Sequence, residues 1–141
     1  MKIDLTRKRA LVTGSTAGIG FAIARSLAES GAGVIVNGRS EDRVSGAVLK
    51  IKSEFPWADV SGVAADLGTS EGAESLFREV ADVDILVNNL GIFEPKPFFE
   101  ITDSDWQKFF DVNVMSGVRM ARRFTPGMVE RKWGRVIFIA S

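Results

Sequence analysis

Apolar residues along the chain follow two spacings that alternate with each other. Short apolar runs of the kind that form buried strands occur at five places: 9–12, 34–37, 60–65, 83–87 and 135–140. Between them, apolar side chains recur at helical spacing in four segments: 21–28, 41–55, 70–80 and 102–126. This alternation predicts βαβ units that form a parallel sheet with helices on both faces.

Polar residues and prolines predict where these helices begin and end. Ser40 and Ser70 are the predicted caps of the second and third helices. Thr102 begins a long helix, and Asp105 is placed to reach back to it as a capping partner. Pro126 is expected to end or kink that helix. The expected apolar side of the long helix consists of Trp106, Phe109, Phe110, Val114, Val118, Ala121 and Phe124.

The composition fits one globular domain over residues 1–141, with 45% hydrophobic and 26% charged residues. Lys and Arg together number 18, as do Asp and Glu, so no net charge favours binding to nucleic acid or to a membrane surface. The chain has no Cys and no His, which argues against a metal site. No apolar run reaches the roughly 18 residues of a membrane span, and the beginning of the chain does not resemble a signal peptide. A cytoplasmic protein is therefore expected.

A glycine-rich turn follows the first predicted strand and precedes the first predicted helix. Glycine permits a tight turn and close approach of a ligand to the backbone, and a helix N-terminus favours a phosphate group. In this strand-turn-helix context the motif predicts a nucleotide site rather than a purely structural turn. The candidate binding residues are Thr13, Gly14, Ser15, Thr16, Gly18, Ile19 and Gly20. A phosphate-loop NTPase is excluded, because the motif lacks the Gly-Lys-Ser/Thr ending.

The end of the second strand bears on the choice of cofactor. Dinucleotide sites often have an acid there that binds the ribose hydroxyls, whereas an Arg accommodates a 2′-phosphate. This chain has Gly38 followed by Arg39, which favours NADP(H) over NAD(H). Taken alone, Arg39 is more typical of a solvated loop charge than of a cofactor contact.

Polar residues also follow the third and fourth strands. Asp66 can accept a hydrogen bond from an adenine amino group, with Leu67 packing nearby, or it can simply cap a turn. Asn88 and Asn89 precede Leu90 and Gly91, and this polar pair with a glycine favours a site over a structural turn. Because ligands bind beyond the carboxyl ends of parallel strands, these groups are expected to lie near the glycine-rich turn.

Two further residues carry little information by spacing alone. Asn113 lies between Val112 and Val114 in the predicted long helix, where it is interpreted as a hydrogen-bonded structural amide. Ser141 follows the fifth strand and has no special signature of its own.

The ordered set of motifs resembles the short-chain dehydrogenase/reductase family. The matching stretches are TGSTAGIG (13–20), Asp66-Leu67, NNLG (88–91), Asn113 and GRVIFIAS (134–141). The resemblance implies a Rossmann-type, doubly wound, three-layer α/β/α fold. It implies hydride transfer between NAD(P)(H) and a carbonyl or alcohol substrate, and assembly as a homodimer or homotetramer. It also implies cofactor contacts from the glycine-rich turn, Arg39, Asp66, Leu67, Asn89 and Gly91.

The resemblance gives catalytic roles to Asn113 and Ser141. In the family the Asn holds a water in a proton relay, and the Ser binds the substrate oxygen. The family also uses a Tyr-x-x-x-Lys pair, but the chain contains no Tyr. The C-terminal part of the fold is therefore expected to be missing, and the 141 residues alone are expected to have little or no reductase activity.

Two alternative functions stay open at the level of sequence. The chain could be a non-catalytic nucleotide-binding or interaction module, which would bind NADPH without turnover. A methyltransferase also has a glycine-rich turn after its first strand, but it usually requires an acid after the second. The substrate is unidentified, and the apolar loop with Phe93, Phe98 and Phe99 favours either a non-polar substrate or burial against a neighbouring subunit.

Overall fold

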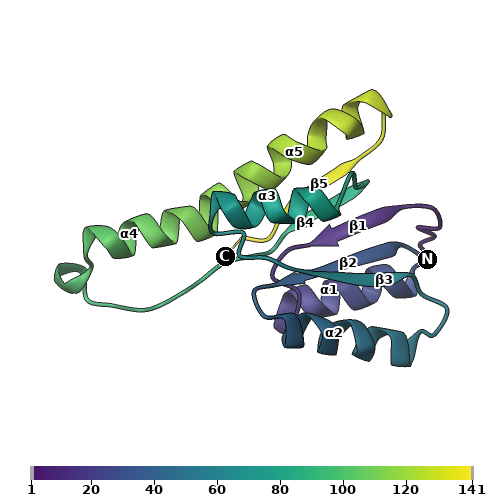
Figure 1. The fold of residues 1–141 in the computed structure, drawn as a ribbon, viewed down its shortest axis with the longest axis horizontal. Coiled ribbons are helices and arrows are strands. Elements are labelled where there is room, and N and C mark those ends of the chain that lie inside the picture. Colours follow the sequence, from purple (N-terminus) through teal and green to yellow (C-terminus); the bar gives the residue numbers. More distant parts are fainter. Residues whose placement is uncertain (1, 141) are drawn as a thin grey trace.

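A computed structural model describes residues 2–140 and contains a parallel sheet of five strands. The strand order is β3-β2-β1-β4-β5, so the order reverses between β1 and β4. All neighbouring strands run parallel (Figure 1). The strands are β1 (Arg9–Val12), β2 (Gly33–Gly38), β3 (Val60–Ala64), β4 (Ile85–Asn88) and β5 (Arg135–Phe138).

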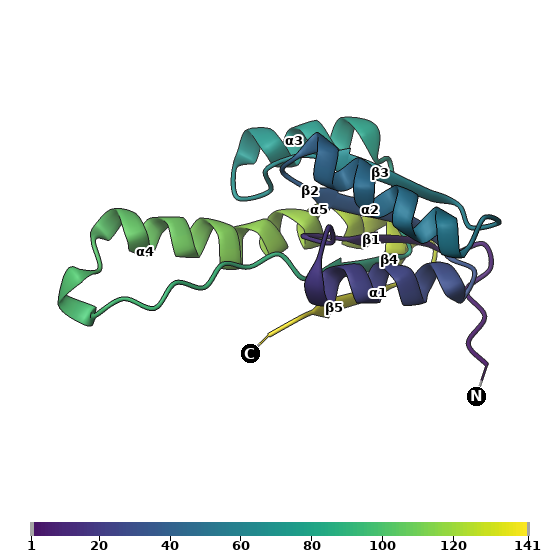
Figure 2. The same ribbon diagram turned by 90° about the horizontal axis from the view of Figure 1, so that it is seen from below.

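Helices cover both faces of the sheet, which confirms the three-layer α/β/α fold of Rossmann type (Figures 1 and 2). One face carries α1 (Gly18–Glu29) and α2 (Glu41–Glu54), and the other carries α3 (Ser70–Glu79) and α5 (Ser116–Glu130). In β1, Ala10 and Val12 pack toward the first pair and Leu11 toward the second. Both faces of the central strands are thus buried, which explains their continuous apolar sequence.

An arm projects beyond the sheet between β4 and α5 (Figures 1 and 2). It contains the 3₁₀ turn η1 (Phe98–Glu100), the helix α4 (Asp103–Phe110) and the π-helical turn η2 (Asp111–Met115). The predicted capping box of α4 is confirmed. The Asp105 N–H donates to Thr102 Oγ1 at 3.1 Å, and the Thr102 N–H donates to Asp105 Oδ2 at 2.9 Å.

Two predictions about the helices are wrong, and one of the two alternatives of a third is excluded. The cap of α3 is Thr69, whose Oγ1 accepts from the Gly72 N–H at 3.0 Å, while Ser70 is already the first helical residue. The predicted continuous long helix is interrupted by η2, because residues in the π turn shift the hydrogen-bonding register. Pro126, expected to end or kink the long helix, does not end it: α5 continues to Glu130, and Phe124 and Met128 are buried on either side of the proline.

Burial also differs from the prediction at two places. Of the predicted apolar side of the long helix, Phe124 is buried, but Trp106 and Phe110 are 58% and 50% exposed. No described element covers α4, since it lies beyond the end of the sheet (Figure 2). Strand β5 was expected to be buried, yet its residues are exposed. Within residues 2–140 it pairs only with β4, and no helix other than α5 packs closely against it, whereas the other edge strand, β3, is covered by both α2 and α3.

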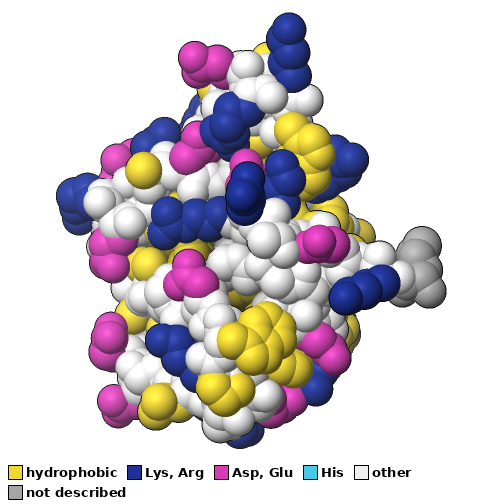
Figure 3. Space-filling view, turned by 90° about the vertical axis from the view of Figure 1, so that its right-hand side faces the viewer, with side chains coloured by type: hydrophobic (Ala, Val, Ile, Leu, Met, Phe, Trp, Pro, Cys, Tyr) yellow, Lys and Arg dark blue, Asp and Glu magenta, His cyan; other side chains and the backbone are white. Residues whose placement is uncertain are grey.

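Charged side chains of both signs are mixed on one face of the molecule (Figure 3). The face shown in Figure 3 carries basic, acidic and apolar side chains next to one another. Within residues 2–140, no helix has both the length and the apolar character needed to cross a membrane.

Candidate functional site

The glycine-rich turn joins β1 to α1 at the point where the strand order reverses. Gly14 and Gly18 have φ of +58° and +57°, a region that side chains with a Cβ rarely adopt. A Cβ on Gly20 would collide with the Gly14 carbonyl oxygen and with the amide of Asn89. The turn therefore requires glycine at all three positions, which leaves the backbone open to a ligand.

Two predicted binding residues hold the turn in place with their side chains. Ser15 is buried, and its hydroxyl donates to the Val12 carbonyl at 2.6 Å and accepts from the Asn37 N–H at 3.0 Å. The buried Thr13 hydroxyl oxygen accepts from the N–H groups of Asn89 and Leu90, both at 3.0 Å. Both hydroxyls thus form hydrogen bonds within the protein, and they stabilise the conformation of the turn.

The segment after β4 forms one wall of the turn. Asn89 donates from Nδ2 to the carbonyls of Thr13 and Gly14, at 3.1 and 2.9 Å. Leu90 lies so close to the turn that a Cβ on Gly14 would be 3.1 Å from the Leu90 Cα. The structure therefore brings the NNLG stretch against the glycine-rich turn, as the sequence predicts.

Asn37, near the end of β2, is a site residue to which the sequence prediction gave no role. Its Oδ1 accepts from the Gly14 N–H at 3.2 Å, and its Nδ2 donates to the carbonyls of Val63 and Ala65 at 3.1 and 3.2 Å. Asn37 is 1% exposed, so these bonds replace water and link β1, β2 and β3. A lone Asn inside an apolar strand was the only available signal.

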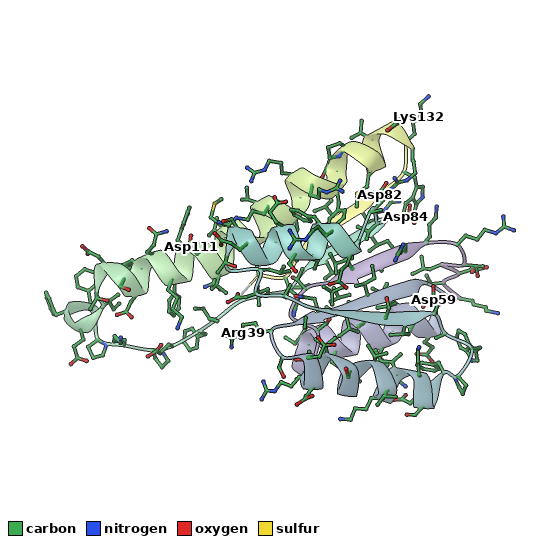
Figure 4. All side chains as sticks on the ribbon, in the orientation of Figure 1. Arg39, Asp59, Asp82, Asp84, Asp111 and Lys132 are labelled. Atoms are coloured by element: carbon green, nitrogen blue, oxygen red, sulfur yellow. The ribbon has the colours of Figure 1, made fainter. Side chains whose placement is uncertain are left out.

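A cleft of about 420 Å³ opens beside the turn, and two arginines line it. Arg39 follows β2 at the carboxyl end of the sheet, whereas Asp59, Asp82 and Asp84 lie at the opposite end (Figure 4). Arg43, in the first turn of α2, is the second arginine and was also missed by the prediction. The lining residues are Gly14, Thr16, Asn37, Gly38, Arg39, Ser40, Arg43, Ala65, Leu67 and Leu90.

Leu67 lines this cleft, whereas Asp66 stands between the lining residues Ala65 and Leu67 without lining the cleft itself. The Asp66 Oδ1 accepts from the Gly68 N–H at 3.0 Å, so the side chain does form the turn that was one of its two predicted roles. Asp66 is nevertheless exposed, so its carboxylate can accept further hydrogen bonds from a ligand. Leu67 is fully buried and supplies an apolar wall to the cleft.

Asn113 lies in the π turn and is hydrogen-bonded to the loop after β4. Its Oδ1 accepts from the Ile92 N–H at 2.7 Å, and its Nδ2 donates to the Ile92 carbonyl at 3.0 Å. Gly91 lies alongside, since a Cβ there would be 3.3 Å from the Asn113 Oδ1. Asn113 is thus a satisfied amide that fixes the start of the arm, while Ser141 lies outside the described residues.

Two further predicted binding residues, Gly18 and Ile19, are accessible from solvent at the start of α1. Ile19 is 66% exposed at the start of α1, and Gly18 has open space around its Cα. Neither residue lines the cleft that contains Arg39. The described residues therefore supply two adjoining features, a glycine cradle at a helix N-terminus and a cleft with two arginines. Both features fit a phosphate-bearing dinucleotide.

Comparison with known proteins agrees with this geometry. Residues 8–141 match the family model described as short chain dehydrogenase. The chain is 57% identical over 141 residues to "Uncharacterized oxidoreductase YvaG" of Bacillus subtilis, covering 100% of this chain and 53% of that protein. It is 35% identical over 145 residues to the 3-oxoacyl-[acyl-carrier-protein] reductase FabG of Aquifex aeolicus, covering 100% of this chain and 58% of that protein. The chain thus spans about half the length of the curated relatives it matches.

A solved structure shows the same fold. L-sorbose reductase from Gluconobacter frateurii, complexed with NADPH and L-sorbose, matches with a TM-score of 0.92 and 36% identity. The match covers 100% of this chain and 55% of that chain. The sheet order, the glycine-rich turn at the reversal point and the family match lead to one conclusion: the chain belongs to the short-chain dehydrogenase family of oxidoreductases.

Proposed function

We propose that the protein carrying this chain is an NADP(H)-dependent oxidoreductase that interconverts a carbonyl and an alcohol. The observation that carries the cofactor preference is the pair Arg39 and Arg43, which line the same cleft beside Gly38. A guanidinium group matches a phosphate in charge and shape, and two of them favour a 2′-phosphate over a hydroxyl. The NADPH bound to the sorbose reductase is consistent with this choice.

The chain's own residues divide into binding and catalytic groups in this proposal. The glycine-rich turn, with its free backbone N–H groups at the start of α1, binds the pyrophosphate. Asp66 and Leu67 hold the adenine, and Asn89 and Gly91 border the ribose of the nicotinamide. When bound, the cofactor supplies or accepts the hydride. Asn113 holds a water for proton transfer, and Ser141 binds the substrate oxygen.

Cofactor titration tests the preference. We expect NADPH to bind more tightly than NADH, and Arg39→Ala to weaken NADPH binding by about tenfold to a hundredfold, as for a lost charge-assisted hydrogen bond. NADH binding should change by less than about twofold, because it lacks the group that the guanidinium binds. Arg7→Ala, far from the cleft, is the matched control. Equal losses for both cofactors would contradict the proposed role of Arg39.

The 141 residues alone are proposed to have little or no reductase activity, because the chain contains neither Tyr nor His as a general acid. Loss of proton donation typically costs about 10²–10⁴-fold in rate. The test measures NADPH oxidation with a panel of ketones and, separately, NADPH binding. Binding without turnover supports the proposal for these 141 residues, and turnover at rates usual for reductases would contradict it.

The non-catalytic module stays the second candidate, because the described residues build a binding site without a general acid. It differs from the reductase in one outcome: the longer protein would bind NADPH and still lack turnover. The family match leaves the methyltransferase interpretation without support.

Substrate and assembly are proposals of the same kind. The relatives act on small molecules such as L-sorbose, so we propose a small carbonyl or alcohol substrate here. Phe93 and Phe99 are 88% and 96% exposed on the arm, which favours covering of this surface by a second copy in a homodimer or homotetramer. Light scattering of the purified protein would measure the assembly directly.

A further inference from the structure

A groove of about 550 Å³ runs between α3 and α5, on the sheet face opposite α2. The two helices lie side by side there (Figure 1). Four arginines line the groove: Arg78 from α3, and Arg119, Arg122 and Arg123 from α5. Glu74 is the one carboxylate among the described lining residues, so the groove is strongly basic in a chain whose total charge is zero.

None of these four arginines forms an ion pair within residues 2–140. Arg25 and Arg131 do form ion pairs, Arg25 with Glu29 and Glu54 and Arg131 with Asp82 and Asp84. Arg39 and Arg43, which line the other cleft, form none within residues 2–140. Like charges gathered in one groove repel each other, and here Glu74 is the one carboxylate among the described lining residues that offsets the repulsion between four arginines. An anionic ligand would also do so.

Two of the guanidinium groups are held within the wall of the groove. Arg119 is half-buried, and its buried Nη1 has no hydrogen-bond partner among the described residues. Unsatisfied buried donors are rare in folded proteins, and among residues 2–140 the Asn88 amide is the other buried side chain of this kind. The Arg119 Nη1 therefore points to an acceptor outside the described residues. The Arg123 guanidinium lies over the rings of Phe77 and Phe124, at 5.6 and 5.8 Å from their centroids, which restricts its orientation.

We propose that this groove is a second ligand site, which binds a phosphate-bearing small molecule. Guanidinium groups bind phosphate through paired N–H donors, and the hydroxyl of Ser70 adds a further donor at the same opening. The volume falls in the range of about 300–1,000 Å³ that is typical of small-molecule sites. The groove shares no residue with the cleft that contains Arg39 and Arg43, so the inference is independent of the proposed function.

Pyrophosphate is the probe, and the protein is first saturated with NADPH so that the glycine-rich turn is occupied. Calorimetric titration should then show one further binding site whose affinity falls as salt is added. The double variant Arg122→Gln/Arg123→Gln should weaken binding by at least about tenfold, because two charge-assisted contacts are lost. Both side chains are exposed, so the fold should be retained, which circular dichroism would check.

Two further variants distinguish specific binding in the groove from nonspecific attraction of pyrophosphate to the positive charge of the protein. Lys52→Gln/Lys108→Gln removes the same charge from exposed positions outside the groove and should change the affinity by less than about twofold. Glu74→Gln removes the one carboxylate of the groove and should tighten binding. The proposal is overturned if pyrophosphate shows no second site, or if the lysine and arginine variants lose affinity equally. It is also overturned if a polyglutamate peptide binds the groove and pyrophosphate does not.

Discussion

The sheet around the glycine-rich turn and the arm from Ile92 to Met115 are built in opposite ways. In the sheet region, the buried hydroxyls of Thr13 and Ser15 and the buried amide of Asn37 have partners, and the apolar side chains of the core are covered. The buried Asn88 amide is an exception, since it has no partner among the described residues. On the arm, large aromatic side chains are exposed, and most of the hydrogen bonds join residues close in sequence, as in the capping box of α4. The first region is specified by its own contacts, whereas the second lacks a partner surface among residues 2–140.

This difference predicts where substitutions change stability most. Leu86 is fully buried in β4, so Leu86→Ala should lower the free energy of unfolding by about 2–5 kcal/mol, from lost apolar burial and the cavity left behind. Phe99 is 96% exposed on the arm, and Phe99→Ala should change the same free energy by less than about 0.5 kcal/mol. Urea unfolding of both variants at low protein concentration measures the contrast. Similar losses would show that the arm is as tightly packed as the sheet.

A matched pair of asparagines sharpens the comparison. Asn37→Ala leaves the Gly14 N–H and the carbonyls of Val63 and Ala65 buried without partners, so it should cost about 1–3 kcal/mol. Asn113→Ala removes two hydrogen bonds at an exposed position, where water can replace them, and should cost less than about 1 kcal/mol. The free energy of unfolding is again the measurement, and an equal cost at both sites would contradict the distinction.

The smallest expected effect is a loss of stability of the arm at acidic pH, when Asp105 is protonated. The Thr102 N–H, followed by the Lys96 ammonium, lowers the pKa of Asp105 from 3.8 to about 2. Because the folded-state pKa is depressed, this contact stabilises the arm above pH 3.8, and the stabilisation is lost as the pH falls through about 2. Carbon NMR of the Asp105 carboxyl should give a titration midpoint near 2, and a midpoint near 3.8 would contradict the contact.

Lys96→Gln provides the control for that titration. The backbone N–H of Thr102 is the larger cause of the shift, and it is unaffected by this substitution. The midpoint should therefore rise only part of the way toward 3.8. A complete return would assign the effect to the lysine rather than to the capping box.

Much of the fold could be predicted from the sequence, because the alternation of strand and helix patterns is strong and local. The glycine-rich turn, the capping box at Thr102 and the approach of Asn89 to the turn all follow from residue type and order. Arg43 was not predicted, because the spacing of apolar residues shows only which side of a helix is buried. The spacing does not show which polar residue of the first helical turn lines a cleft.

The wrong predictions for β5 and α4, for the cap of α3 and for the π turn each have a physical cause. The apolar runs of β5 and α4 predict burial, but burial also depends on neighbouring elements that a local pattern does not specify. The cap of α3 moved from Ser70 to Thr69, since both side chains can accept the bond and only the backbone geometry selects one. The π turn was not predicted, because the apolar spacing continues through it.

The Thr13 hydroxyl links the assembly of the site to the order of folding. Its oxygen receives N–H groups that lie 76 and 77 residues away in the chain. Closing so long a loop carries an entropic cost and slows contact formation relative to local turns. A chain that has formed only β1, α1 and β2 therefore has the glycine turn without the wall supplied by Asn89. Nucleotide binding during synthesis should begin only after β4 has been made and paired with β1.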